Sequence, residues 1–253
     1  MLLIKGVIPL VDYALPLDMK NRTPEEQEEL EKDWRYLIPL YTYFCMDMYF
    51  NYWLLNVFYF DFPLLSFYQQ FLFMLFLGTG SGTNVVVGHE LTHRKEFFHY
   101  FCGIILYFRF LYTNFGITHT QGHHKWVATP LDPASAEQGQ SVYPFAIKSM
   151  YYSFWQGWNI EKERLLKKYP KLSAMSLVLD NHVFQLKMLE LVYLGVICYF
   201  WGVRVTLLWI IIAFMLQFSL EVINYVEHYG LRRKEIAPGK YEKTNIMHSW
   251  NAA

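Results

Sequence analysis

The sequence lacks an excess of charge of either sign. Its 22 Lys and Arg residues balance its 22 Asp and Glu residues, so the formal net charge is zero. Proteins that bind nucleic acid usually carry a basic face with interleaved aromatic residues, and no such stripe is visible in this chain. The composition therefore gives no reason to expect a nucleic-acid partner.

Cysteine is also scarce. The three cysteines, Cys45, Cys102 and Cys198, lie far apart and within apolar segments. This spacing indicates neither a disulfide framework nor a thiolate metal site, so we expect all three to be small buried hydrophobic residues. A cleavable signal peptide is not indicated, because the N-terminus has no basic lead and Lys5 interrupts its apolar run.

Hydrophobic residues are abundant, at 54% of the chain. They are concentrated in runs of about 20 residues, the length that a helix needs to cross a bilayer. We predict an all-α fold, a polytopic membrane helical bundle with a histidine-rich cytoplasmic cap, forming a single domain over residues 1–253. Four complete spans are expected near residues 37–60, 63–87, 186–200 and 205–226, and they should pair in chain order as two antiparallel hairpins. The parts expected in the cytoplasm or at the membrane interface are residues 88–185 and 227–253.

Six of the nine histidines fall into three groups at the edges of apolar segments. They are His89 and His93, then His119, His123 and His124, and finally His228. Histidines four residues apart lie on one face of a helix, so each of the first two groups supplies a same-face pair, and the adjacent ring of the second can turn to a neighbouring ion. Imidazole suits iron, copper, zinc and nickel, whereas calcium and magnesium prefer oxygen. Six imidazoles exceed the needs of one tetrahedral ion, which indicates two metal ions or a site partly completed elsewhere.

Residues 97–115 are apolar but contain Arg109 and lie between the first two histidine groups. A single crossing here would place His93 and His119 on opposite sides of the membrane, where they could not share a metal. We therefore predict a re-entrant or interfacial segment, with Arg109 as an interface anchor. Asp47, in the first span, is ambiguous and can pair with a neighbouring helix.

Basic residues are distributed unevenly between the predicted links. They gather on one side of the bundle, whereas the two opposite links carry only Asp61 and Arg204. The positive-inside rule then places all three histidine groups on the cytoplasmic face of an integral membrane protein. Residues 145–168 are expected to form an amphipathic helix at the headgroup level. The membrane would be the endoplasmic reticulum in a eukaryote and the plasma or inner membrane in a bacterium.

Some histidines also have simpler interpretations. The stretch from His89 through Glu90 to His93 matches the zinc-protease pattern, with Glu90 as the base and Asp132 as a remote third ligand. That interpretation leaves His228 and the second histidine group without a role. The three remaining histidines are expected to cap helices or to make ordinary hydrogen bonds: His99, His182 and His248.

Three stretches around the histidines carry a family resemblance. They are Gly88-His89-Glu90-Leu91-Thr92-His93-Arg94-Lys95, then Gly122-His123-His124 running into the VATPLDPASA sequence of residues 127–136, and Asn224 to Leu231 with the closing His248-Ser249-Trp250-Asn251. Together they resemble the membrane alkane 1-monooxygenases, or alkane ω-hydroxylases, of the fatty-acid desaturase/hydroxylase superfamily. The VATPLDPAS run is the most specific part, because no metal-binding argument requires it. The resemblance covers essentially the whole chain.

This resemblance implies six membrane helices under a cytoplasmic cap that holds two non-haem iron ions. The implied metal ligands are His89, His93, His119, His123, His124 and His228. Residues implied to orient these ligands are Glu90, Asp132 and Glu227. The implied reaction inserts one atom of O2 into a terminal C–H bond of an alkane or alkyl lipid. Electrons would come from NAD(P)H through a reductase and a rubredoxin-like carrier.

The chain departs from the family pattern at two places. Thr118 stands before His119, where the family usually has glutamate, and the sequence stops at Ala253, before the last histidine-rich motif of the family. The resemblance also leads us to expect that the first membrane helix and most of the second are missing. We expect a fragment or truncated gene product that is inactive or binds metal poorly.

Several alternatives stay open at this point. The same chemistry would serve a fatty-acid desaturase or a related hydroxylase, such as one acting on a methyl-substituted aromatic. The zinc protease described above belongs to another class. A third interpretation is a non-catalytic relative retained for assembly or lipid binding. The sequence does not determine chain-length preference or oligomeric state.

Overall fold

The computed structural model describes residues 33–250 apart from 81 and 95, together with positions 7, 10, 11, 13, 14, 23, 26, 29 and 30. Its helices are Trp34–Tyr36 (3-10), α3 (Leu37–Asn56), Val57–Asp61 (π), Phe62–Leu64 (3-10), α4 (Phe67–Gly80), α5 (Gly82–Thr92), α6 (Phe97–Phe108), α7 (Phe115–Ile117), Thr118–His123 (π), α8 (His124–Trp126), α9 (Val142–Lys168), α10 (Ala174–Leu179), α11 (His182–His228) and Ile246–His248 (3-10). Two short strands, β1 (Glu235–Ala237) and β2 (Lys240–Tyr241), form an antiparallel pair. Residues 1–6, Lys95 and Asn251 lie outside the described residues.

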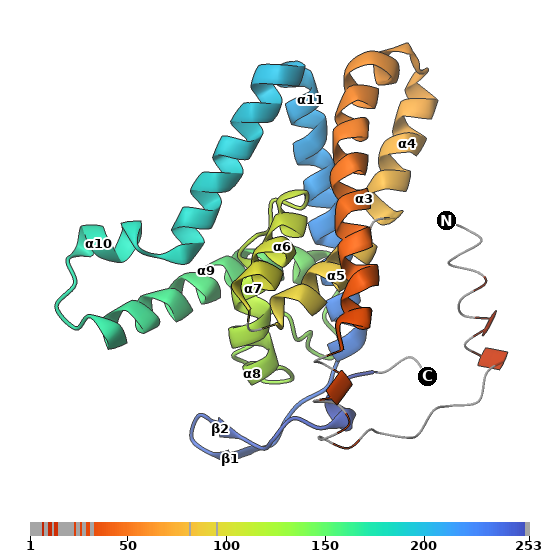
Figure 1. The fold of residues 1–253 in the computed structure, drawn as a ribbon. Coiled ribbons are helices and arrows are strands. Elements are labelled where there is room, and N and C mark those ends of the chain that lie inside the picture. The colour runs from red at the N-terminus through yellow and green to blue at the C-terminus, as the bar shows by residue number, and fades with distance from the viewer. Residues whose placement is uncertain are drawn as a thin grey trace.

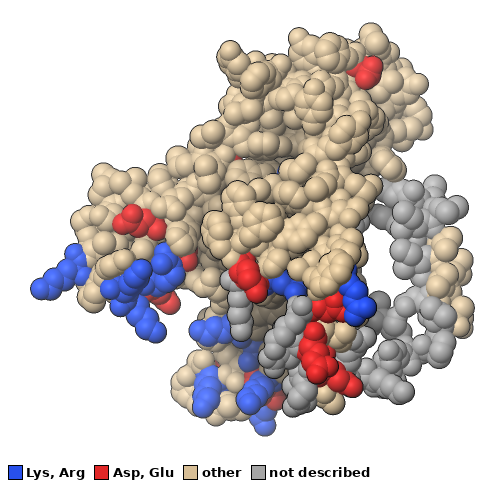
Figure 2. All heavy atoms as spheres, in the orientation of Figure 1, with Lys and Arg blue, Asp and Glu red and all other residues tan. Residues whose placement is uncertain are grey.

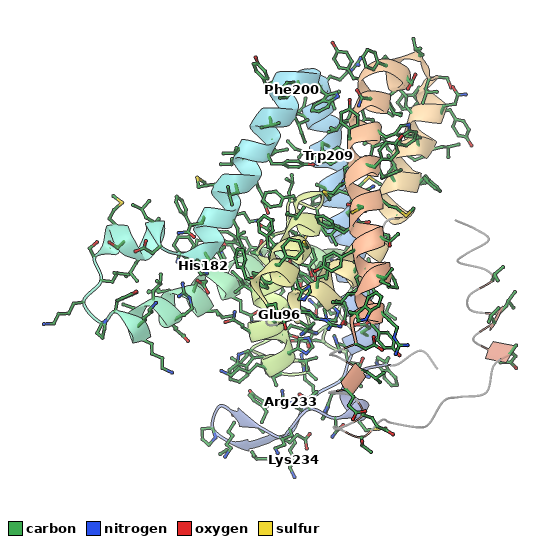
Figure 3. The ribbon with its side chains drawn as sticks, viewed as in Figure 1. Glu96, His182, Phe200, Trp209, Arg233 and Lys234 are labelled. Carbon is green, nitrogen blue, oxygen red and sulfur yellow. The ribbon has the colours of Figure 1, made fainter. Side chains whose placement is uncertain are left out.

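Helices α3, α4 and α11 stand together in the upper part of the molecule (Figure 1). After α3 the chain reaches a tight link at Pro63 and returns as α4, so these helices form the predicted hairpin. Helix α11 bends at Gly202, whose φ of +82° is accessible to glycine without steric cost. Its two halves form the second predicted hairpin. Figure 3 shows Phe200 near the bend, His182 at the start of the first half and Trp209 on the second.

Two described stretches are long and apolar enough to cross a membrane, Phe67–Thr92 and His182–His228. The second has 47 residues, so each side of its bend holds about 30 Å of helix or more. The predicted span at residues 37–60 is not among them, since the tyrosines and Asp47 of α3 lower its hydropathy. The count of four spans is therefore not confirmed. Figure 2 shows that Lys, Arg, Asp and Glu gather in the lower half of the visible face, while the upper half is almost uncharged. The chain has the composition of a membrane protein.

The main core lies where the second half of α11 packs against α3 and the π-helix that follows it. Trp209 and Ile212 from α11 meet Leu54 and Phe58 from the other side, and each of these side chains is at most 1% exposed. Between helices surrounded by lipid, such close packing takes the place of the hydrophobic effect as the main source of association. The core holds α11 in place, and α11 ends at His228.

Helices α5 and α6 pack closely against each other. A Cβ atom at Gly103 would lie 2.8 Å from the carbonyl oxygen of Gly88 and 2.7 Å from Cγ2 of Thr92, so only glycine permits this approach. Helix α6 has 12 residues, about 18 Å of helix, which is too short for a bilayer core of about 30 Å. The chain then turns back at residues 109–114, as predicted, and brings its second histidine segment towards α5. The depth of this segment in a membrane remains a prediction.

Helix α9 confirms the helix predicted at residues 145–168 and begins three residues earlier, at Val142. It leads through α10 into the first half of α11, and these elements extend to one side of the bundle as an arm (Figure 1). Helix α9 packs on α11 through a face made of small residues. These residues include Ser149, Ser153 and Gly157, which are buried and follow one another at intervals of four residues. Its position at the headgroup level remains a prediction.

Three expectations are corrected by the structure. Arg109 is not an interface anchor: it is 3% exposed, and its guanidinium lies 3.1 Å from the carboxylate of Asp47. Asp47 therefore pairs with a residue at the end of a neighbouring helix, as was expected. Cys102 is buried as expected, but Cys45 is exposed and Cys198 is half-buried, because both lie on outward faces of apolar helices. The β1–β2 pair adds a small sheet to the predicted all-α fold.

Candidate metal centre

Imidazole rings from α5 and from the segment after α6 converge at one place. His89 lies on α5 and His93 directly follows the last residue of this helix, one turn further along, with ring centroids separated by 4.4 Å. The second segment contributes His119, 4.5 Å from His89, and His124, 4.9 Å from His93, again between ring centroids. The ligand nitrogen atoms of all four rings lie within 4.8 Å of one another. These residues form the four-histidine group, and they meet on one side of the molecule as a shared metal site requires.

The second segment presents His119 and His124, five residues apart, instead of a pair at four-residue spacing. The reason is local: Thr118–His123 is a π-helix, in which residues five apart come onto one face. Nε2 of His124 lies 3.0 Å from Nε2 of His119. His123 is therefore the ring that turns away, so the expectation that His124 would do so is wrong.

Contacts behind the rings fix the π-helix. The Phe115 ring stacks on His119 with a centroid distance of 4.8 Å. The Thr118 hydroxyl donates to the carbonyl of Asn114 at 3.2 Å, and its methyl group fills the space that a Cβ at Gly157 would occupy. Thr118 thus serves as a packing contact with α9, and it brings no carboxylate to the histidines.

His123 is held by a carboxylate. Its Nδ1 donates to Oδ2 of Asp132 at 2.9 Å, since an ionised carboxylate can only accept. Asp132 is in turn fixed by the Ser135 hydroxyl at 2.6 Å and the Ala134 amide at 3.2 Å. This arrangement leaves Nε2 of His123 as the lone-pair nitrogen, which is how carboxylates usually orient a metal-binding histidine. The contact between Asp132 and His123 supports the orienting role that was predicted for Asp132.

The loop that carries Asp132 is braced from both ends. Ala128 has a φ of +57°, an unusual backbone for a residue with a Cβ. Its amide donates to the Ser135 hydroxyl at 2.8 Å, and its carbonyl accepts from the Arg233 amide at 2.7 Å. The Arg233 side chain, labelled in Figure 3, donates to the carbonyl of Lys125 at 2.9 Å. The segment after α11 therefore stabilises the loop beside the histidines.

His228, at the end of α11, stands beside His123 with ring centroids 4.9 Å apart, and we call these two the His123–His228 pair. Its Nδ1 lies 3.1 Å from the backbone carbonyl of His248 and donates to it, because the carbonyl can only accept. Trp250 secures that segment by donating to the backbone carbonyls of Glu227 and Tyr229. Sequence reasoning missed the role of the His248 backbone, although the closing motif was the signal that could have found it.

The two other candidate orienting residues are placed differently. Glu90 contacts Arg94, one turn along α5, at 3.0 Å. A carboxylate oxygen of Glu227 lies 3.8 Å from Nε2 of His228, beyond hydrogen-bonding distance. Their proposed roles toward the histidines remain predictions.

The protonation of the histidines outside the apolar helices differs between the groups. Burial, together with the neighbouring imidazoles, lowers the pKa of His119 and lowers that of His124 to about 4. For His123 burial also disfavours the charged form, but the Asp132 carboxylate outweighs it and raises the pKa of the imidazole. Burial raises the pKa of Asp132, yet His123 and the hydrogen bonds from Ser135 and Ala134 outweigh it and lower the pKa of that carboxyl.

These donors fit a redox metal. The four-histidine group offers only imidazole nitrogens. The lowered pKa values of His119 and His124 favour neutral imidazole, which is the form that binds metal. Four nitrogens at this separation can surround one ion, and imidazole suits iron, copper or zinc far better than calcium or magnesium. The His123–His228 pair presents two more oriented nitrogens next to the first group.

A groove of about 850 Å³ opens beside the histidines. It lies between α9 and the Asp132 loop, and its lining includes Trp126, Leu131, Asp132, Trp155 and Gln156. Asp132 and Gln156 also line a much smaller cavity that contains His119 and His123. The groove therefore reaches the outer side of the Asp132 contact without exposing the rings of the four-histidine group.

Comparison with known proteins identifies the class. The sequence profile of the Fatty acid desaturase family matches residues 65–253. The chain belongs to this family.

The relatives narrow the resemblance further. Over 98% of its length the chain is 31% identical to the alkane 1-monooxygenase of Pseudomonas putida and 31% identical to alkane 1-monooxygenase 1 of Alcanivorax borkumensis. It is also 30% identical, over 65% of its length, to the hydroxylase component of the xylene/toluene monooxygenase of Pseudomonas putida. The chain spans 60% of the length of the two alkane monooxygenases and 42% of the length of the xylene enzyme. The predicted family resemblance is confirmed.

Proposed function

We propose that this chain carries the metal centre of a membrane non-haem di-iron monooxygenase of the alkane 1-monooxygenase type. The reaction inserts one oxygen atom of O2 into a terminal C–H bond of an alkane or another alkyl chain, and the second atom leaves as water with two protons and two electrons. The observation that carries the proposal is that four imidazoles, two from the end of α5 and two from the π-helix and the start of α8, bring their ligand nitrogens within 4.8 Å of one another.

Each group has its own part in the proposal. The four-histidine group would hold one iron, and the His123–His228 pair would contribute two ligands to a second. Bound iron supplies the capacity to bind and reduce O2. The protein orients the ligands: Asp132 holds the ring of His123, and the backbone of His248 holds the ring of His228. Such contacts fix the tautomer that leaves Nε2 free for the metal.

The surrounding helices suit a hydrocarbon substrate. The apolar helices α4 and α11 stand together in the upper part of the molecule (Figure 1), and α11 ends at His228, so an alkane dissolved in the bilayer could approach along them. The charged residues lie towards the opposite, lower half of the visible face (Figure 2). That distribution supports a site on the polar, cytoplasmic side of the membrane. The electrons would come from NAD(P)H through a reductase and a rubredoxin-like carrier, as the family resemblance implies.

The geometry disfavours the zinc-protease alternative. Its proposed third ligand, Asp132, makes hydrogen bonds to His123 and Ser135, away from His89 and His93. The positions next to these two histidines are taken by other imidazoles of the four-histidine group. The general base of a protease, Glu90, forms an ion pair with Arg94.

Product analysis tests the proposal directly. Membranes containing the protein would be given NADH, a reductase and a rubredoxin, with an n-alkane, a fatty acyl chain or a xylene as substrate. A 1-alkanol that is absent from a His119→Ala variant supports the proposal. A desaturated acyl chain or a methyl-hydroxylated aromatic as the main product would replace it with one of the related reactions. Iron binding without any product would match either the inactive fragment expected from the sequence or the non-catalytic relative. One zinc per chain together with peptide hydrolysis would favour the protease.

A further inference from the structure

The turn at residues 109–114 is an irregular piece of backbone inside the helical bundle. Phe110, Tyr112, Thr113 and Asn114 are each at most 4% exposed. Leu111 has a φ of +50°, a left-handed conformation that is costly for a residue with a Cβ. Non-helical backbone among membrane helices persists only where its polar groups find partners in the protein.

An ion pair on the first half of α11 supplies such partners. Lys187 and Glu190 lie one turn apart, with Nζ 2.9 Å from Oε2 of the glutamate. The Lys187 ammonium donates to the carbonyl of Leu111 at 3.0 Å. Glu190 accepts from the amide of Thr113 at 2.8 Å and from its hydroxyl at 2.6 Å. The Lys187 cation therefore binds a backbone carbonyl of the turn, and the Glu190 anion binds a backbone amide of the same turn.

Other helices contact the same turn. Gln217, on the second half of α11, donates to the carbonyl of Phe110 at 2.6 Å, and the Tyr112 hydroxyl donates to Glu221 at 3.1 Å. Asp47 on α3 binds Arg109 at the start of the turn. Of these contacts, the Lys187–Glu190 pair is the one that binds both a carbonyl and an amide within the turn.

The turn leads directly into the histidine segment. The Phe115 amide donates to the carbonyl of Tyr112 at 2.9 Å, and the Thr118 amide donates to the carbonyl of Asn114 at 3.0 Å. Phe115 then stacks on His119. A shift of the turn would therefore move His119 relative to α5 through two hydrogen bonds and one ring contact.

We propose that Lys187 and Glu190 are positioning residues, which clamp this turn and so place His119 and His124 against His89 and His93. The inference rests on the proposed function in that these rings are taken as the metal ligands. The role requires a hydrogen-bond donor at position 187 and an acceptor at position 190, because the carbonyl of Leu111 needs a donor and the amide of Thr113 an acceptor. Neither residue touches the metal site itself.

Co2+ binding to the purified metal-free protein in nanodiscs tests the proposal. Glu190→Leu should weaken Co2+ binding about tenfold, the lower end of what contacts behind a metal ligand contribute. Glu190→Gln keeps an acceptor for Thr113 and should stay within about threefold of the wild type. The charge-swapped variant Lys187→Glu/Glu190→Lys restores an ion pair but reverses its polarity towards the turn, so it should behave like Glu190→Leu.

Hydrogen exchange of residues 111–123, measured by mass spectrometry without metal, gives a second readout that follows the clamp itself. Exchange should accelerate in Glu190→Leu and in the charge swap but not in Glu190→Gln. If Glu190→Leu does not fold, Thr113→Val removes the hydroxyl contact alone and should shift both readouts in the same direction. Glu161 offers a matched control, because it is a buried acid paired with Arg164 one turn away and lies on α9. Glu161→Gln should change neither readout.

The outcomes separate this inference from the proposed function. Wild-type affinity and exchange in the charge swap, or in Glu190→Leu, would overturn the clamp. If instead the wild-type Co2+ spectrum is insensitive to His119→Ala, the metal-centre proposal fails, while the exchange data still decide whether Lys187 and Glu190 hold the turn.

Discussion

The two histidine groups are constructed on different principles. In the four-histidine group the rings contact one another: Nε2 of His93 lies 2.8 Å from Nε2 of His89, and the His119–His124 contact is similar. In the His123–His228 pair each ring is turned by an oxygen atom, from the Asp132 carboxylate in one case and from a backbone carbonyl in the other. The first group is defined by four rings that face a common point, and the second by two rings whose orientation is fixed by oxygen acceptors.

This difference has a consequence for metal binding. Four imidazoles that already face a common point can all bind one ion, so each nitrogen contributes directly to affinity. Two oriented imidazoles supply fewer nitrogens, and their contribution depends on contacts behind the rings. Variants of ligands and variants of supporting residues should therefore affect the two groups unequally.

The largest effect is expected from His119→Ala, which removes one nitrogen from the centre of the four-histidine group. Binding of the first Co2+ ion should weaken by more than about 100-fold, because contacts behind a ligand alone are worth 10–100-fold. Titration followed by the visible absorption of Co2+ measures this change. His99→Ala is a matched control, since His99 contacts Tyr41 outside the group, and it should leave the affinity unchanged. Equal losses in both variants would show that the four rings do not act as a unit.

The large features of the fold could be predicted from hydrophobic patterning. The hairpins at Pro63 and Gly202 follow from a proline and a glycine between apolar runs, and the turn before His119 follows from the need to bring two histidine groups together. The pairing of Asp47 with Arg109 could not be derived in this way. The two residues are 62 positions apart, and only the packing of α3 against the end of α6 brings them into contact.

The residues of the site could be predicted from the sequence, but their division into the four-histidine group and the His123–His228 pair could not. Histidine spacing on an α-helix gives the wrong partner for His119, because the departure to a π-helix at Thr118–His123 depends on packing against α9 and leaves no mark in the spacing. The VATPLDPAS run pointed to Asp132 through resemblance. The structure adds a physical reason: this loop carries the carboxylate to His123 and is braced by Ser135.

Asp132→Asn should sharpen the contrast between the groups with an intermediate effect. The amide keeps the shape of the side chain but loses the charge that orients the His123 ring and raises its basicity. Co2+ binding by the His123–His228 pair, measured in a His119→Ala background, should weaken about tenfold. In the otherwise wild-type protein the first Co2+ ion should bind almost as before. A large loss at the four-histidine group would mean that the two groups share one site.

The smallest effect is expected from His248→Ala, although His248 is buried beside the pair. His228 binds the backbone carbonyl of His248, which alanine retains. The His248 ring itself is engaged elsewhere: Nδ1 accepts from the amide of Asn245 at 3.0 Å, and Nε2 faces Glu242 at 3.4 Å. Loss of that capping contact should cost about 1 kcal/mol of stability and leave Co2+ affinity within about twofold of the wild type. A tenfold loss of affinity would identify the His248 ring as a ligand. The rings of the second group would then also face a common metal ion.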